Sequence, residues 1–207
     1  MNNFFKQKLL YYVIIIILKN KAKIRANVLL KMRNFISNEK KQETLEILSK
    51  LVLSNNFVNS GSIGLFMNTE FEFELFELFR ICKDKKKKIF VPKTFSHHQM
   101  AFIELEEKTI TDYLAGDLER QSETQQLARG KFGIWEPRWG IAGVPDLIVV
   151  PGVAWNSKGH RIGYGGGFYD RYLANFKGHT VSLIYDFQKA EFEAELHDIA
   201  VKEIFSV

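Results

Sequence analysis

A short stretch of the chain combines glycines, an arginine and an aspartate that together could bind phosphate. Its glycines are Gly163, Gly165, Gly166 and Gly167. Because they lack Cβ atoms, their backbone N–H groups can approach an anion closely and adopt positive φ angles. Arg161 would add a positive charge, and Asp170, in the first turn of a helix predicted to run toward Phe176, could hold the divalent cation of a polyphosphate. The stretch is not a P-loop, because no Gly-Lys-Ser/Thr follows the glycines.

The elements around this stretch predict where it lies. The apolar run from Asp146 to Val150 is typical of a strand covered on both faces, and Pro151–Gly152 ends it. Further strands are predicted over residues 62–67, 89–91, 100–105 and 180–185, and helices over 21–36, 37–54 and 72–84, the last with Phe73, Phe76 and Phe79 facing inward. This alternation predicts an α/β fold, a single three-layer domain with a mostly parallel sheet and helices on both faces. Ligands of such sheets bind at the carboxyl ends of the strands, where we expect Met67, Glu72, Pro151 and the glycine loop to meet.

Two cations near the start of the chain form a second candidate feature. The helical period of residues 21–36 places Lys21 and Arg25 one turn apart on a common face. Two adjacent positive charges cost helix stability, and an anion between them would offset that cost. The alternative interpretation is a basic helix face in water.

Several segments, in this order, resemble the 5-formyltetrahydrofolate cyclo-ligase family, also called methenyltetrahydrofolate synthetases. The densest match is the string of Asp146, Pro151–Gly152, Gly159, Arg161–Gly163, Gly165 and Gly167–Arg171. Residues 21–25 resemble the K-x-x-x-R ATP motif of the family, and residues 62–67 with Glu72 resemble its folate-side strand and glutamate. Residues 88–92 and 132–137 also fall where the family has a strand ending in proline and a Gly-Ile-x-Glu-Pro turn. The resemblance covers about residues 20 to 205.

The resemblance implies the ligands and assigns residues to them. ATP would bind the family's two nucleotide motifs, here Lys21, Ala22, Lys23, Ile24, Arg25, Arg161, Ile162, Gly163, Tyr164, Gly165, Gly166, Gly167, Phe168 and Tyr169. The folate substrate would contact Met67, Glu72, Tyr164, Gly165, Gly166, Gly167 and Phe168. Arg161, Lys21 and Arg25 would neutralise phosphate charge during catalysis, and Asp170 and Asp198 would hold Mg²⁺. Arg161, at the mouth of the loop, and Arg25 are expected to face solvent without ATP, so changing either to alanine should leave the fold intact. Lys202 departs from the family, which often has an aspartate at that position.

The implied reaction is the ATP- and Mg²⁺-dependent cyclisation of 5-formyltetrahydrofolate to 5,10-methenyltetrahydrofolate, with ADP and phosphate as the other products. The formyl oxygen attacks the γ-phosphate to give an N5-iminium phosphate, and N10 then closes the ring as phosphate leaves. Glu72 would accept hydrogen bonds from the N–H groups of the pterin edge, since a carboxylate matches such an edge with two acceptors. The alternative for Glu72 is an acid that merely begins a helix.

The composition of the chain limits its possible disulfides, ligands and partners. The chain has 207 residues, a net charge of +5 and a single cysteine, Cys82, so no intrachain disulfide can form. The charge would suit ATP and folates, polyglutamylated ones included, but equally nucleic acid or an acidic membrane surface. The spacings of the histidines do not indicate a zinc site. We expect a cytoplasmic monomer that binds small molecules, with no nucleic acid partner. A folate- or nucleotide-binding protein without turnover and a basic RNA-binding module remain alternatives, although the chain lacks the RNA-binding RNP and KH motifs.

The first residues lie outside the resemblance and are predicted to form an extension over residues 1–20, ahead of a domain over 21–207. The apolar run Leu9–Leu18 is shorter than the roughly 20 residues of a spanning helix. It is similar to the hydrophobic part of a signal peptide, but no small-residue cleavage site follows it. We therefore expect no stable membrane insertion, and either a poorly ordered extension or a helix packed on the domain. The alternative is a segment that faces a membrane surface.

Overall fold

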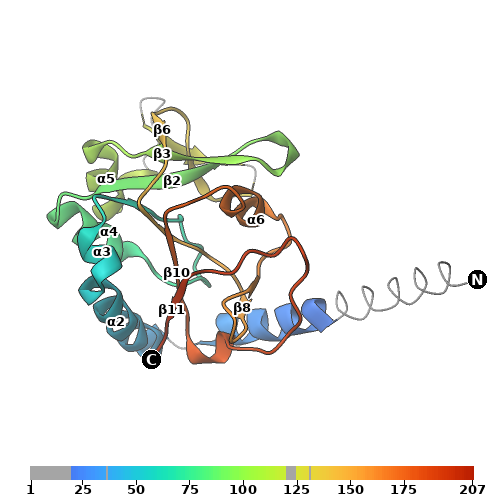
Figure 1. Cartoon of the computed structure of the whole chain (residues 1–207). Coiled ribbons are helices and arrows are strands. Elements are labelled where there is room, and N and C mark those ends of the chain that lie inside the picture. The colour runs from blue at the N-terminus through green and yellow to red at the C-terminus, as the bar shows by residue number, and fades with distance from the viewer. Residues whose placement is uncertain (1–19, 36, 120–124, 131) are drawn as a thin grey trace, which may run out of the picture.

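The computed structural model describes residues 20–35, 37–119, 125–130 and 132–207. Seven strands of this part of the chain form one sheet in the order β11-β10-β7-β1-β2-β3-β6 (Figure 1). Five of them are parallel, namely β11 (Glu203–Phe205), β10 (His179–Leu183), β7 (Leu147–Val149), β1 (Ser62–Gly64) and β2 (Lys88–Thr94). At one edge, β3 (Met100–Glu104) runs antiparallel to β2, and β6 (Ala142–Gly143) runs antiparallel to β3. The predicted mostly parallel sheet is confirmed.

Helices alternate with these strands along the chain. Residues 20–34 are helical, and the following helices are α2 (Ser37–Leu53), α3 (Asn55–Asn59), α4 (Phe76–Asp84), α5 (Glu107–Leu114) and α6 (Phe168–Leu173). Three short 3₁₀ turns are η1 (Ser96–His98), η2 (Asp117–Glu119) and η3 (Asp186–Gln188). Two small antiparallel pairs complete the fold, β4 (Leu127–Arg129) with β5 (Trp135–Pro137) and β8 (Ala154–Trp155) with β9 (Arg161–Ile162).

The central strand β7 shows why the domain has three layers. Successive side chains of a strand point to opposite faces, so Leu147 and Val149 lie in one core while Ile148 and Val150 lie in another. The first core is closed mainly by α2 and α4, the second by α6 and the residues around it. Each of the four side chains is at most 1% exposed, and full burial of such a side chain stabilises the fold by about 1.5–3 kcal/mol. The predicted helices on both faces are confirmed.

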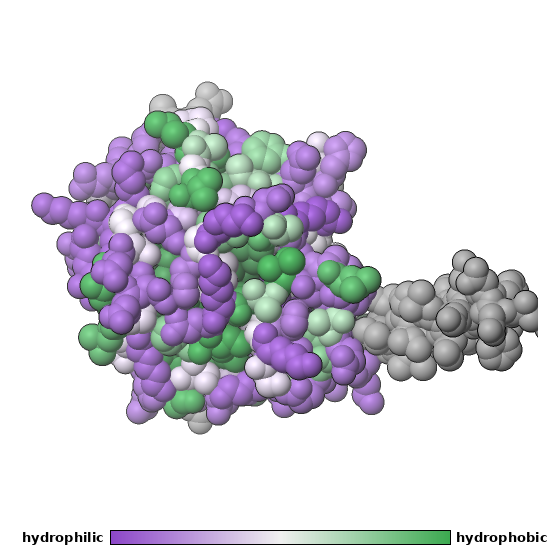
Figure 2. Space-filling view, in the orientation of Figure 1, coloured by the Kyte–Doolittle hydropathy of each residue, from purple (hydrophilic) through white to green (hydrophobic). Residues whose placement is uncertain are grey.

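The helical segment over residues 20–34 has its own place in the domain. Val28 and Met32 are buried against Val153, Ile162 and Phe192, so the segment packs on the β8–β9 pair. The predicted extension lies outside the described residues except for residue 20. Among the helices that the structure describes, no stretch is both long and apolar enough to cross a membrane. The face of the molecule in Figure 2 is mostly hydrophilic, with hydrophobic residues gathered near its middle.

Three predictions about helices were wrong in detail. The helix predicted over residues 72–84 begins only at Phe76, because the carboxylate of Glu72 accepts hydrogen bonds from the backbone and side chain of Thr69 and closes a turn there. Phe76, predicted to face inward, is 39% exposed, whereas Phe73 and Phe79 are buried as expected. The helix predicted to run toward Phe176 ends at Leu173.

Candidate active site

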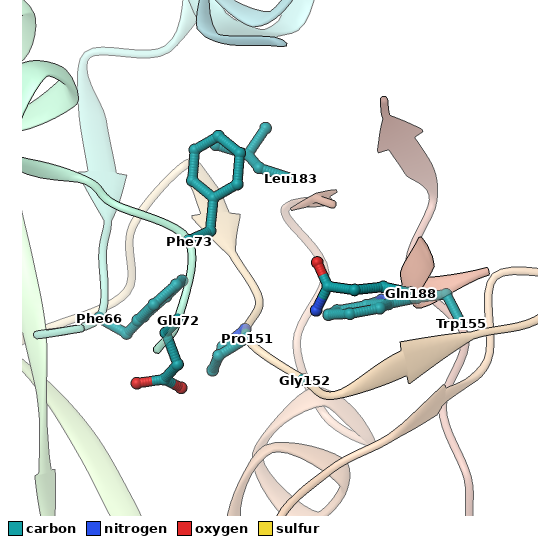
Figure 3. A pocket seen from close by; sticks show the side chains of 8 residues that line it. All are labelled: Phe66, Glu72, Phe73, Pro151, Gly152, Trp155, Leu183 and Gln188. Carbon is teal, nitrogen blue, oxygen red and sulfur yellow. The ribbon is translucent and has the colours of Figure 1, made fainter. Parts of the chain in front are cut away.

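A small pocket lies at the carboxyl ends of β1 and β7, which are neighbours in the sheet (Figure 3). On one side of this pair the sheet continues from β1 to β2 and β3, and on the other side it continues from β7 to β10 and β11. The pocket therefore lies where the strand order reverses. Open α/β sheets bind ligands at this position. The residues that line it are Phe66, Glu72, Phe73, Pro151, Gly152, Trp155, Leu183 and Gln188. The predicted meeting of Glu72 and Pro151 is therefore confirmed.

Glu72 supplies the acid of this pocket. It is only 6% exposed, and its Oε2 accepts hydrogen bonds from the backbone N–H of Thr69 at 2.8 Å and the hydroxyl of Thr69 at 3.0 Å. Both contacts use one oxygen, and the side chain of Tyr164 is a further hydrogen-bond partner of Glu72. Figure 3 shows the carboxylate on the same side of the pocket as Pro151. The side chain is thus held by its own turn and does not merely begin a helix.

Neighbouring positions in the sequence differ in their relation to the pocket. Met67, predicted to contact the folate, is 3% exposed and packs in the core beneath α2 and α4, while Phe66 lines the pocket. Trp155 and Gln188 also line it and were missed by the sequence analysis. The sequence feature that could have indicated Trp155 is Gly152, three residues earlier, because a glycine leaves room for an indole ring beside it. Indeed, a Cβ at Gly152 would approach the indole ring to 2.8 Å.

The glycine loop leads from β9 into α6 with an open backbone. Gly165 has φ 99° and Gly167 has φ 65°, and residues other than glycine rarely adopt such values. Cβ atoms placed on Gly163 or Gly165 would meet no heavy atom of the described residues within 4 Å. The loop therefore offers open backbone to a ligand at Gly163 and Gly165, as an anion-binding loop requires, whereas Gly166 and Gly167 are covered by the side chains of Phe168 and Arg171.

The helical segment meets this loop through one arginine. The Nε of Arg25 donates to the carbonyl oxygen of Gly163 at 2.8 Å. Lys21, one turn earlier, also points into the domain and is 7% exposed. Ala22 and Lys23 are exposed, and Ile24 packs against the core formed around Val28. Of the predicted K-x-x-x-R motif, the structure thus brings Arg25 to the glycine loop, whereas Lys21 contacts Glu195 and Asp198 of the C-terminal segment.

Arg161 is buried, which corrects an expectation. We predicted a solvent-facing guanidinium at the mouth of the loop, but its side chain is 3% exposed. Its Nη2 lies 3.1 Å from Oδ1 of Asp170, and its Nη1 donates to the carbonyl oxygen of Ile199 at 2.8 Å. Burial lowers the pKa of Arg161, and the charge of Asp170 opposes that effect. The buried guanidinium joins β9, α6 and the C-terminal segment.

The two aspartates predicted to hold Mg²⁺ both carry cationic partners. Asp170 accepts from Arg161 and from the backbone N–H of Ile199, each through Oδ1. Asp198 accepts from the Nζ of Lys21 at 2.6 Å and from the N–H of Glu195 at 2.7 Å, each through Oδ2. Carboxylate oxygens are the ligands that Mg²⁺ prefers, so both side chains have the chemistry of a magnesium ligand. In this structure, however, one oxygen of each is occupied by a cationic partner.

Tyr164 of the glycine loop and Tyr169 of α6 lie near Glu72. Burial, followed by the charge of Glu72, raises the pKa of Tyr169, and burial, the charge of Glu72 and a hydrogen bond to Glu72 raise the pKa of Tyr164. The hydroxyl of Tyr169 and the indole nitrogen of Trp155 are buried with no hydrogen-bond partner among the described residues. Buried polar groups are nearly always paired, so these two atoms are suited to a ligand that supplies the missing partners.

Aromatic contacts place Phe168 at the start of α6. Its ring centroid lies 5.4 Å from that of His98 and 6.1 Å from that of Phe132. Phe168 thus ties the glycine loop to the β2–β3 connection. Lys202, the departure noted in the sequence, donates to the carbonyl oxygen of Gly178 at 2.7 Å. Gly178 precedes β10, at the amino end of a parallel strand, so Lys202 lies at the edge of the sheet opposite the pocket.

Fold and site together define an α/β protein with a ligand site at the carboxyl ends of its strands, beside an open glycine loop. The chain matches the 5-formyltetrahydrofolate cyclo-ligase family over residues 17–206, and it belongs to that family, whose members are ligases of folate metabolism.

Individual relatives agree with this assignment. The 5-formyltetrahydrofolate cyclo-ligase of Haemophilus influenzae is 27% identical over 195 residues, which is 86% of this chain and 92% of that protein. The structure of 5,10-methenyltetrahydrofolate synthetase from Aquifex aeolicus is 28% identical and superposes with a TM-score of 0.71, covering 89% of this chain and 88% of that one. The Mycoplasma pneumoniae synthetase, 22% identical with a TM-score of 0.69 over 90% of this chain and 98% of that one, shows the shared fold.

Proposed function

We propose that this protein catalyses the ATP- and Mg²⁺-dependent cyclisation of 5-formyltetrahydrofolate to 5,10-methenyltetrahydrofolate. The observation that carries the proposal is the hydrogen bond from Arg25 to the carbonyl oxygen of Gly163, at 2.8 Å. It joins the two segments that resemble the family's nucleotide motifs although they are distant in the sequence. The pocket that contains Glu72 lies on the same side of the sheet as these two segments, as a reaction between two bound substrates requires.

ATP would lie along the glycine loop. Backbone N–H groups of Gly163–Gly167 and the charges of Lys21 and Arg25 would neutralise phosphate oxygens, and positioning with charge neutralisation is the main source of catalysis in phosphoryl transfer. We place Arg161 behind this layer, because it is buried against Asp170. Mg²⁺, held by Asp170 and Asp198, would reduce the negative charge on the phosphates.

The folate would enter the pocket beside Glu72. Its carboxylate would accept from the N–H groups of the pterin edge, while Phe66, Trp155 and Phe168 cover the ring. The formyl oxygen would then attack the γ-phosphate, which converts a poor leaving group into phosphate. N10 would close the ring, and the phosphate would leave with the former formyl oxygen.

The pocket must widen for this substrate. Its volume is about 10 Å³, close to that of a single water molecule. A pterin ring therefore requires the glycine loop and the aromatic side chains around Glu72 to move apart. Closure of such loops over bound substrates is common among enzymes that must exclude water.

The decisive experiment mixes the purified protein with ATP, Mg²⁺ and 5-formyltetrahydrofolate and follows the near-UV absorbance of the methenyl product. Product formation supports the proposal. Binding of both ligands without product would favour the alternative, a binding protein of the same fold, and no binding of either would exclude both.

The variant Glu72→Gln tests the folate site separately. The amide oxygen can keep the contacts to Thr69, but the amide N–H then faces a pterin edge that also presents donors. We expect KM for 5-formyltetrahydrofolate to rise by an order of magnitude or more, at about 1.4 kcal/mol per tenfold, with ATP binding nearly unchanged by calorimetry. Glu74→Gln, an exposed neighbour, is the control. Equal weakening of both ligands would mean that Glu72 supports the fold instead.

A further inference from the structure

Lys21 lies between two carboxylates of the C-terminal segment. Its Nζ is 2.7 Å from Oε1 of Glu195 and 2.6 Å from Oδ2 of Asp198. The side chains of Lys21 and Asp198 are 9% and 10% exposed, and that of Glu195 is 25% exposed. The ammonium group is therefore a largely buried cation held by two acids from the opposite end of the chain.

The charge of Lys21 is retained in this position. Burial alone would lower the pKa of Lys21, but hydrogen bonds to Asp198 and Glu195 outweigh burial and raise it. Burial likewise would raise the pKa of Asp198, but the bond to Lys21 and the N–H of Glu195 lower it. Both groups are therefore charged near neutral pH, and the contact is an ion pair.

The proposed function gives each partner another ligand. Lys21 belongs to the motif assigned to ATP phosphates, and Asp198 to the pair assigned to Mg²⁺. Among the described residues, one cluster of three groups could hold a metal ion, Glu195, His197 and Asp198, and its ligand atoms lie within 4.8 Å of one another. The ammonium of Lys21 already contacts two of these three residues. A divalent cation at Asp198 would therefore meet a like charge at contact distance.

We propose that Lys21 exchanges partners when nucleotide binds, moving from Asp198 and Glu195 to the phosphates and thereby exposing Asp198 to Mg²⁺. This inference rests on the proposed function. Without nucleotide, the ammonium neutralises the acids and excludes a metal ion. With nucleotide, the phosphates take the ammonium, and the released carboxylate can bind the cation that accompanies them. Nucleotide and metal then favour each other's binding, as thermodynamic linkage requires.

Lysine suits this exchange better than arginine would. Its ammonium is a point charge on a flexible stem of four carbons, with three donors that can be redirected. Glu195 acts as a positioning residue for Lys21, because it holds the ammonium in the nucleotide-free protein and is not one of the two aspartates assigned to Mg²⁺. The N–H of Glu195 also donates to Oδ2 of Asp198, so both acids are fixed in one turn.

The first experiment measures Mn²⁺ binding to the full chain without nucleotide, by the electron paramagnetic resonance signal of free Mn²⁺. We expect Lys21→Met to bind Mn²⁺ about tenfold tighter or more than wild type, since one charge-assisted contact is removed from the metal site. Lys31→Met, an exposed lysine of the same helical segment, is the matched control and should match wild type. Equal Mn²⁺ affinity of Lys21→Met and wild type would overturn the exchange.

A second variant decides the question if Lys21→Met does not fold. Glu195→Gln weakens the hold on Lys21, so we expect a nonhydrolysable ATP analogue in the presence of EDTA to bind about threefold tighter or more by calorimetry, the effect of one weakened charged contact. Glu193→Gln, which is exposed nearby, should match wild type. Unchanged or weaker binding by Glu195→Gln would overturn the exchange alone, whereas failure of the wild type to bind the analogue would count against the proposed function.

Discussion

Two ion pairs of the site use the same chemistry in different surroundings. Arg161 and Asp170 lie on β9 and α6, which follow each other in the chain, and the guanidinium is 3% exposed. Lys21 and Asp198 come from opposite ends of the chain, 177 residues apart. The arginine has a second contact to the carbonyl oxygen of Ile199, while the lysine divides its donors between two acids. Each pair includes one of the two aspartates that we propose as ligands of Mg²⁺.

The difference separates a fixed support from an exchangeable contact. A planar guanidinium that is almost fully buried and bound on two sides cannot leave without exposing unpaired polar groups. The Lys21 ammonium contacts two acids of the C-terminal segment, one turn from Arg25 at the glycine loop, and can change partners by rotation of its stem. We therefore expect Arg161 to hold α6 in place and Lys21 to change its contacts when nucleotide binds.

The largest expected effect is that of Arg161→Ala on stability. Removal of one partner of a buried pair typically costs about 3–5 kcal/mol, because the other charge and the carbonyl oxygen of Ile199 lose their partner. We expect the free energy of unfolding in urea to fall by about that amount, contrary to our sequence-based expectation that the fold would be unaffected. Arg33→Ala, at an exposed arginine, should change it by less than about 1 kcal/mol. An equally small effect for Arg161→Ala would show that the guanidinium is not a support.

Smaller effects are expected for Asp170 and Asp198, which should share a change in Mg²⁺ dependence but differ in their effect on stability. Asp170→Asn and Asp198→Asn each remove a hard anionic ligand, so both should require about tenfold more Mg²⁺ for activity. Only Asp170→Asn also leaves a buried arginine without its counter-charge, so only this variant should lower the free energy of unfolding by more than about 2 kcal/mol. Asp186→Asn, paired with a surface lysine, serves as control. Identical stabilities of the two site variants would remove the distinction between the pairs.

Much of this architecture could be predicted from the sequence. The apolar run of β7 predicted a strand covered on both faces, and Leu147 to Val150 alternate between two cores as such a strand must. The glycines at positions 163, 165, 166 and 167 predicted an open loop, and Gly165 and Gly167 have the positive φ angles that only glycine adopts easily. These features follow from local properties of single residues, namely their hydrophobicity and the absence of a Cβ atom.

Other features depend on contacts between distant segments. No local pattern shows that Lys21 would meet Asp198, because the pairing requires the helical segment to pack on the β8–β9 pair first. The burial of Arg161 was missed for the same reason, since its partner Ile199 comes from the C-terminal segment. The start of α4 at Phe76 results from the turn closed by Glu72, a competition between side-chain and helical hydrogen bonds that propensity alone does not settle.

The smallest expected effect concerns pH and isolates the Lys21 pair. The pKa of Lys21 is raised above its ordinary 10.5, so its stabilising contribution is complete below that pH and is lost only as pH rises through the raised value. The pKa of Asp198 is lowered below its ordinary 3.8, so its contribution is complete above that pH and is lost as pH falls through the lowered value. The stability difference between wild type and Lys21→Met, measured by urea unfolding, should therefore vary by less than about 0.5 kcal/mol from pH 6 to pH 8. A larger change would show that the ion pair of Lys21 and Asp198 itself responds to pH near neutrality, contrary to the directions of both pKa shifts.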